Sequence, residues 1–403
     1  MLTSFHLPLR RGIFAAAGLA CLVAMVPAHA ADPVILTFAT VGDSRQDPVA
    51  PDASTLPVSA QDQNWLQNTK AWSRIIRSIQ SQKANMLFFN GDMVMGYGNG
   101  SPLPKTTNVS GTWTPASLPS GLTTDTTDFY RQYGFWRGMV APLMETGTYV
   151  VPVPGNHEVQ CKACGKIATV GNENIWRDNM GDLIIDQARF SNLLGGPIQN
   201  FDVNNHPQIG DTIGTAAGDA TTIQTDQSQL SYSFDFNGSH FAVINTDAVG
   251  NDSHAPVTWL TADLAAAAAR GAAHFFVFGH KPAFTYKYAT SVTKPSGFDA
   301  NPVNQQAFWD LIEQYHATYF SGHEHIFNMV QPRAATGGTA WQVLVGSGGS
   351  PFETSVATAN PNDRKYAWAN VRVFQSGKVE IDAYGFDENF GPTQLLQTVT
   401  LPQ

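Results

Sequence analysis

Charged residues and cysteines are both scarce in this sequence. Lys, Arg, Asp and Glu make up 14% of the 403 residues and Cys occurs 3 times, whereas charged residues usually amount to about a quarter of a soluble protein. Acidic residues outnumber basic ones, 32 to 23, and the formal net charge at pH 7 is −9. Such a surface repels nucleic acid and anionic membranes, so no nucleic-acid partner is expected, although a local basic site is compatible with it. Internal repeats and interdomain linkers are also missing.

The first 30 residues have the pattern of an export signal. Arg10 and Arg11 precede an apolar run from Gly12 to Val26, and Ala28–Ala30 supplies the small residues that a signal peptidase recognises. The run is too short and too rich in small residues for a good membrane span. We predict cleavage after Ala30 and a periplasmic or secreted protein with no membrane segment. The arginine pair leaves twin-arginine export open beside the general route.

Only Cys161 and Cys164 remain after this cleavage. They could form a disulfide, half of a zinc knuckle or a redox pair. No second Cys pair completes a four-cysteine zinc site. A redox pair normally begins a helix after a strand, whereas this pair lies in a segment rich in Gly and Lys. In an oxidising compartment a structural disulfide is the favoured interpretation.

Apolar runs and helical patterns alternate along the mature chain. Strand–helix alternation in the first half indicates parallel pairing, and later hairpins, such as the one around Asn237-Gly238, indicate antiparallel additions. We expect strands within residues 34–43, 84–92, 148–158, 230–247, 274–280, 317–323, 341–350, 366–374 and 378–386, and helices within residues 62–80, 259–271 and 305–315.

Three stretches interrupt this order, at about residues 97–127, 162–229 and 286–301. They are rich in Gly, Thr, Asn and Pro. In a compact domain, loops of this length are usually binding loops or lids. We therefore expect one α/β domain, residues 31–403, that carries these three insertions.

Metal-binding side chains follow five of the apolar runs. They are Asp43, Asp92, Asn156 with His157, His280, and the pair His323 and His325. Open α/β sheets bind ligands at the carboxyl ends of their strands. In an extended segment residues i and i+2 point the same way, so His323 and His325 could face one small volume. Each residue alone has a simpler role in a cap or turn, but five such strand ends together predict a metal site.

This order of motifs resembles that of the calcineurin-like metallophosphoesterases, which include purple acid phosphatases and cyclic-nucleotide phosphodiesterases. The matching motifs are GDSR (42–45), GDMV (91–94), GNHE (155–158), GHKP (279–282) and GHEH (322–325). Each motif alone is weak, and their common order and flanking strands make the resemblance specific. It implies an α/β fold, a four-layer α/β/β/α sandwich of two mixed sheets flanked by helices.

The resemblance also implies two metal ions about 3–4 Å apart. Asp92 would bridge them. The other ligands would be Asp43 and His325 for one ion, and Asn156, His280 and His323 for the second. Carboxylates, an amide oxygen and imidazoles suit Mn, Fe or Zn.

The implied activity is hydrolysis of a small phosphoester. His157 would protonate the leaving alkoxide or orient the phosphate, while water activated by the metals attacks phosphorus in line. The sequence leaves open whether the substrate is a monoester or a diester, and it leaves the oligomeric state open.

Two positions depart from the family's pattern. A histidine ligand usually stands two residues after the first aspartate, and here that residue is Arg45. Arginine cannot coordinate a metal, so we expect a catalytic role in which its planar fork holds the phosphate; the alternative is an outward ion pair with an acid such as Asp47. The tyrosine of red-coloured purple acid phosphatases is replaced by Met95, so a tyrosinate–iron site is not expected.

Other functions share parts of this pattern. The metallo-β-lactamase fold also uses a strand ending in HxH but requires Asp-His directly afterwards, where this chain has Ile326-Phe327. A two-domain 5′-nucleotidase would need a large domain after Arg364, and too few residues follow. The serious alternative is a degenerate, non-catalytic family member that binds one metal or a phosphorylated ligand.

Overall fold

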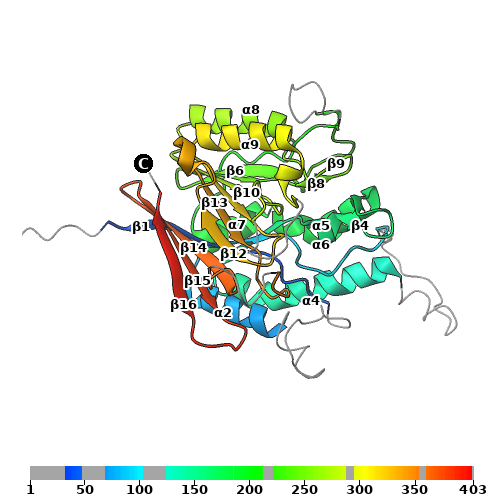
Figure 1. Cartoon of the computed structure of the whole chain (residues 1–403), viewed down its shortest axis with the longest axis horizontal. Coiled ribbons are helices and arrows are strands. Elements are labelled where there is room, and N and C mark those ends of the chain that lie inside the picture. Colours follow the sequence, from blue (N-terminus) through cyan, green and yellow to red (C-terminus); the bar gives the residue numbers. More distant parts are fainter. Residues whose placement is uncertain are drawn as a thin grey trace, which may run out of the picture.

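The computed structural model describes residues 32–47, 69–102, 124–184, 186–211, 221–286, 295–353 and 360–401. The predicted signal peptide, residues 1–30, lies outside these ranges, as do parts of each predicted insertion, so the export signal stays a prediction. Two six-stranded sheets carry helices on their outer faces (Figure 1). The predicted fold class, a sandwich of two mixed sheets flanked by helices, is confirmed.

The first sheet combines parallel strands with an antiparallel extension from the end of the chain. β1, β2 and β3 are parallel, and β14, β15 and β16 add to β1 in antiparallel fashion. In spatial order the strands are β16 (Gln394–Thr400), β15 (Val379–Phe386), β14 (Tyr366–Phe374), β1 (Val34–Val41), β2 (Met86–Asn90) and β3 (Tyr149–Val153).

The second sheet has a parallel centre and antiparallel edges. β7, β10, β11 and β13 are parallel, while β12 and β6 pair antiparallel at the two edges. In spatial order the strands are β12 (Phe327–Val330), β13 (Trp341–Val345), β11 (Thr318–Ser321), β10 (His274–Phe278), β7 (Ser239–Val243) and β6 (Tyr232–Phe236). The turn between β6 and β7 contains Asn237 and Gly238, both with positive φ, so the predicted hairpin is confirmed.

The helices cover the outer faces. α2, α4 and α6 contact strands of the first sheet, and α8 and α9 lie over the second (Figure 1). Their bounds are α2 (Trp72–Gln82), α4 (Asp125–Glu145), α6 (Val170–Ile184), α7 (Gln187–Leu194), α8 (Val257–Ala269) and α9 (Pro302–Gln314). Among the described residues, no helix combines the length and apolar character that a membrane crossing requires.

Three of these helices differ from the sequence-based expectation. α4 was not expected, although Phe129, Tyr133 and Trp136 are buried on one of its faces. α6 and α7 lie inside the insertion predicted as irregular at about residues 162–229. The Gly, Thr and Asn content of both regions hides the helical spacing of their apolar residues. The helices form all the same, because burial of one helix face stabilises a helix more than the helix propensity of single residues does.

Aromatic side chains join the two sheets beneath the strand ends. Phe88 of β2 stacks on Phe278 of β10 with 3.7 Å between ring centroids. Phe38 of β1 packs edge-to-face with Phe276 of β10, with 4.9 Å between their centroids. These side chains are at most 1% exposed. Since Asp92 follows β2 and His280 follows β10, this packing sets the separation of candidate ligands from different sheets.

We predict that Phe88→Ala lowers the free energy of unfolding by about 3–5 kcal/mol, the usual cost of truncating a buried Phe. Leu395→Ala is the control, because Leu395 is 57% exposed and should change stability by less than about 0.5 kcal/mol. Urea unfolding of both variants measures the difference. Equal losses would show that the Phe88 contact does not hold the sheets together.

Candidate metal centre

The predicted site residues meet where the parallel strands of both sheets end. Asp43 follows β1, Asp92 follows β2, and Asn156 and His157 begin the short helix α5 (Asn156–Val159) after β3. From the second sheet, His280 follows β10 and His323 follows β11. All of the predicted site residues are buried except the half-buried Arg45 and His323.

One group of donor atoms surrounds Nε2 of His280. Oδ1 of Asn156 lies 2.8 Å from this nitrogen, Oδ1 of Asp92 lies 3.1 Å away, and Nδ1 of His323 lies 3.2 Å away. Oδ1 of Asn156 and Nδ1 of His323 are themselves 2.9 Å apart. Four donors about 2.0–2.1 Å from a tetrahedral metal are spaced similarly, so this group matches the dimensions of a metal site.

Two of these donors have lone pairs that their outer hydrogen bonds direct into the group. Nδ1 of His280 donates to the carbonyl oxygen of Asn90 at 2.7 Å, so Nε2 of the neutral ring is a bare acceptor. The amide of Asn156 donates to the hydroxyl of Tyr97 through Nδ2, which directs Oδ1 to the histidines. Lone pairs this close repel each other unless a proton or metal ion lies among them. The donor set therefore fits a cation.

A second group lies on the side of Asp43. Oδ1 of Asp43 is 3.7 Å from Nε2 of His325, whose Nδ1 donates to the carbonyl of Pro351 at 2.7 Å. Asp43, Asp92 and His280 can each place one donor atom within 4.8 Å of the other two. Asp92 thus lies between the two groups, where a bridging ligand has to be.

The buried carboxylates of this region need positive charge nearby if they are to be ionised. Burial raises the pKa of Asp43 well above its usual value. Burial would also raise the pKa of Asp92, but His157 and His280 hold that pKa well below its usual value. Burial would lower the pKa of His280, yet the Asp92 and Asp43 carboxylates raise it to about 10. Without a metal ion, a proton on His280 supplies part of the missing charge.

Arg45 points into this region. Its Nε donates to Oγ of Ser350 at 3.1 Å. Its Nη1 lies 3.4 Å from Nε2 of His157, and its Nη2 lies 3.2 Å from Nδ1 of His325. The carboxylate of Asp47 accepts from Arg131 and Gln132. The guanidinium therefore reaches the side of the site that holds His325.

Comparisons with known proteins show the family of this chain. A model of the calcineurin-like phosphoesterases matches residues 63–327. The chain belongs to the calcineurin-like phosphoesterase family.

Two solved structures of phosphatases match this chain, and the first is similar to it in fold. A purple acid phosphatase isolated from yellow lupin (Lupinus luteus) seeds is 13% identical with a TM-score of 0.53, and the match covers 91% of this chain and 53% of that one, so this chain spans about half its length. A dimetal phosphatase from Danio rerio is 10% identical over 91% of this chain and 100% of that one, with a TM-score of 0.41. No curated protein matches the sequence.

The backbone of this family member is strained at the candidate metal centre. Asp43, Arg45, Asp92 and His323 all have positive φ, between 40° and 74°, which is costly for residues other than glycine and is typical of functional sites. The expectation that His323 and His325 lie in an extended segment is wrong, because His323 sits in a turn after β11. In this turn Glu324 is directed away, and its carboxylate accepts from the backbone of Tyr286 at 2.9 Å.

Glu158 holds two of the family motifs together, a role that the sequence analysis missed. Its carboxylate accepts from the backbone N–H groups of Asp92 (2.9 Å), Met93 (2.8 Å) and Gly155 (2.8 Å). The GDMV and GNHE loops are therefore locked to each other through one buried side chain. In a capping box a Glu follows the first residue of the motif by three positions, as Glu158 follows Gly155. This spacing was the feature of the sequence that could have indicated its role.

Tyr97 is the second missed residue. Its ring packs on His157 with 3.8 Å between centroids, and its hydroxyl accepts from Asn156. Burial raises the pKa of this hydroxyl above its ordinary value, which keeps it protonated. The structure also contains the predicted disulfide between Cys161 and Cys164, close to this loop.

We predict that Mn²⁺ or Zn²⁺ added to chelator-treated protein raises its melting temperature, because an ion at 100 times its Kd contributes about 2.7 kcal/mol. Asp92→Asn should lose most of this effect, since it removes charge from both donor groups. Asp382→Asn is the control, a buried carboxylate that pairs with Arg372 in the first sheet. Equal metal-dependent shifts in both variants would contradict a bridging position for Asp92.

Proposed function

We propose that this protein is an exported, metal-dependent phosphoesterase that hydrolyses small phosphomonoesters or phosphodiesters. The observation that carries the proposal is the convergence of six candidate ligands from both sheets, with the Arg45 guanidinium pointing among them. Export rests on the N-terminal sequence pattern alone.

Asn156, His280 and His323 would hold one ion, Asp43 and His325 would hold the other, and Asp92 would contact both. When bound, two such ions lower the pKa of a coordinated water and offset the charge that develops on the phosphoryl oxygens. The hydrogen bonds of His280 to Asn90 and of His325 to Pro351 fix the ring orientations that this requires.

Arg45 supports the binding of a phosphate on the side of His325. Its bond to Ser350 and the contact of Nη1 with Nε2 of the neutral His157 ring hold the planar fork in one orientation. Such a fork donates to two oxygens of a phosphate at once and stabilises charge in the transition state. Its fixed charge also disfavours a cation nearby, so we expect the ion held by Asp43 and His325 to bind more weakly than the other.

His157 is the proposed acid. Its Nδ1 donates to the carbonyl oxygen of Met95 at 2.5 Å, and its Nε2 faces Arg45 and lies 3.6 Å from Oδ2 of Asp92. Burial, and then Arg45, lower the pKa of His157 to about 4 even though Asp92 opposes them. A phosphate bound to Arg45 would add negative charge beside this ring and favour its protonated form, which can then donate to the leaving oxygen.

The second candidate is a family member that binds one metal or a phosphorylated ligand without turnover. Arg45 is the observation that favours it, because a permanent cation stands near the place of a usual ligand. Hydrolysis of p-nitrophenyl phosphate and its bis ester, with and without Mn²⁺, separates the two functions. Metal-dependent turnover supports the enzyme, and tight phosphate binding without turnover supports the alternative.

We predict that His157→Ala keeps its metal content and lowers turnover by about 10²–10⁴, the usual contribution of a positioned acid. His206→Ala is the control, because His206 pairs with Asp226 outside the site. Elemental analysis and steady-state kinetics give both quantities. Loss of metal from His157→Ala would make His157 a ligand instead.

We also predict that Arg45→His raises metal occupancy while it weakens phosphoester binding or turnover, because it exchanges a cation for an imidazole ligand. Arg45→Gln is the matched variant, since it removes the charge and supplies no imidazole. The occupancy gain should be larger for His than for Gln. Unchanged occupancy and unchanged kcat/KM in both variants would show that Arg45 does not act in the site.

A further inference from the structure

The amide of Asn156 needs a partner that fixes its orientation. Its two ends are similar in size, but Oδ1 can coordinate a cation whereas Nδ2 carries two N–H groups and repels one. Oδ1 faces His280 at 2.8 Å and His323 at 2.9 Å, and Nδ2 donates to the hydroxyl of Tyr97. A side chain that binds Nδ2 therefore selects the rotamer in which the oxygen is directed into the donor group.

The same tyrosine supports His157. Its ring lies against the imidazole at 3.8 Å between centroids with an interplanar angle of 43°. The imidazole is held from another side by the carbonyl of Met95. Tyr97 thus touches one candidate metal ligand with its hydroxyl and the proposed acid with its ring.

Tyr97 is itself held in an unfavourable backbone conformation. Its φ is 63°, a conformation that is unfavourable for a residue other than glycine and persists only where the surroundings impose it. Its N–H donates to the carbonyl of His157 at 3.0 Å, and its carbonyl accepts from the N–H of Lys162 at 2.9 Å. Gly96 cannot be replaced here, because a Cβ at that position would lie 1.9 Å from the carbonyl oxygen of His157.

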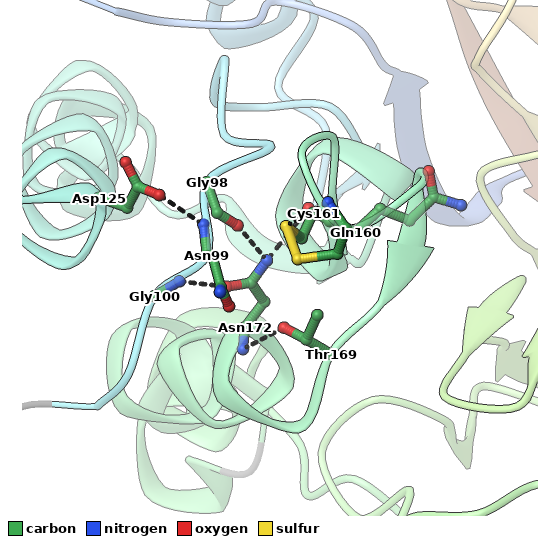
Figure 2. Close-up of a disulfide and its surroundings, with 9 residues drawn as sticks. Gly98, Asn99, Gly100, Asp125, Gln160, Cys161, Thr169 and Asn172 are labelled. Atoms are coloured by element: carbon green, nitrogen blue, oxygen red, sulfur yellow. Dashed lines mark hydrogen bonds between the residues drawn. A yellow bond between two sulfur atoms is a disulfide. The ribbon is translucent and has the colours of Figure 1, made fainter.

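The segment after Tyr97 is anchored by two helices (Figure 2). The buried Asn172 of α6 donates to the carbonyls of Gly98 and Gln160 and accepts from the N–H of Gly100. Asp125 of α4 accepts from the N–H of Asn99 at 2.6 Å. Lys162, which donates to Tyr97, lies within the turn closed by the Cys161–Cys164 disulfide. This scaffold gives the ring one position relative to Asn156 and His157.

We infer that Tyr97 is a positioning residue for the candidate metal centre: its hydroxyl selects the ligating rotamer of Asn156, and its ring fixes the imidazole of His157. The inference rests on the proposed function, because it assigns Tyr97 a role toward the metal that Asn156 would hold. The two contacts make separable contributions. Removal of the hydroxyl should affect metal affinity, and removal of the ring should also affect turnover.

The test compares Tyr97→Phe, Tyr97→Leu and the wild type by Mn²⁺ titration against a chelating dye. Tyr97→Phe should lower the Mn²⁺ affinity of one site by about 10–100-fold, the usual effect of losing an outer hydrogen bond to a ligand. Its kcat should return close to the wild-type value at saturating Mn²⁺, because the ring remains. Tyr97→Leu should show the same loss of affinity and keep a lowered kcat at saturating Mn²⁺.

Two controls separate this role from a structural one. Tyr149 lies on β3, and its hydroxyl donates to the carbonyl of Leu183 at 2.6 Å. Tyr149→Phe removes this hydroxyl and should leave Mn²⁺ affinity unchanged. In an Asn156→Asp background both side-chain ends are oxygens, so the rotamer no longer matters. There, Tyr97→Phe should lower affinity by a smaller factor than it does beside Asn156, because an outer hydrogen bond is lost but no rotamer selection.

Unchanged Mn²⁺ affinity in Tyr97→Phe would overturn the inference. The same loss of affinity in the Asn156→Asp background would overturn it as well, because the hydroxyl would then act by another route. Affinity and turnover are measured separately, so failure of the proposed function appears as a wild type without hydrolysis, whereas failure of this inference appears in the binding data of Tyr97→Phe.

Discussion

The charge of two buried carboxylates is the constraint on which the rest of the site depends. Asp43 and Asp92 are 0% and 2% exposed, and with His280 they place donor atoms within 4.8 Å of one another. Burying ionised carboxylates is strongly unfavourable unless positive charge is close by. Arg45 supplies part of this positive charge, the carboxylates raise the pKa of His280, and the remaining donors have the chemistry of metal ligands. The strained loops and the clamp by Glu158 hold these mutually repelling groups in place.

The two halves of the site, the donors around His280 and the side of Asp43 and His325, differ in structure and in the role that we assign to them. The donors around His280 are close to one another and are oriented by Asn90 and, through Asn156, by Tyr97. The side of Asp43 and His325 is looser and shares its space with Arg45. We interpret the first half as the tighter metal position and the second as the place where an anionic substrate offsets the fixed cation.

The sequence predicted the fold class and placed the site residues on their strand ends, because both depend on local patterns: apolar runs of strand length, each followed by a metal-binding side chain. It missed α4, α6 and α7, whose apolar stripes lie among Gly, Thr and Asn. It also missed Tyr97, because the contact with Asn156 arises only when a turn with positive φ brings residues 97 and 156 together. Contacts created by long-range packing leave no periodic trace in the chain. The positive φ at His323 is likewise not signalled, because it falls on the histidine and not on a glycine.

Anomalous diffraction from crystals grown with Mn²⁺ tests the central claim most directly, because it locates the ions without reference to activity. The account predicts two peaks about 3.5–4 Å apart, one in contact with Asn156, His280 and His323, the other beside Asp43 and His325, with Asp92 touching both and the second peak weaker. Peaks outside this set of residues, or a single ion that leaves Asp92 uncoordinated, would contradict a two-metal centre at these strand ends.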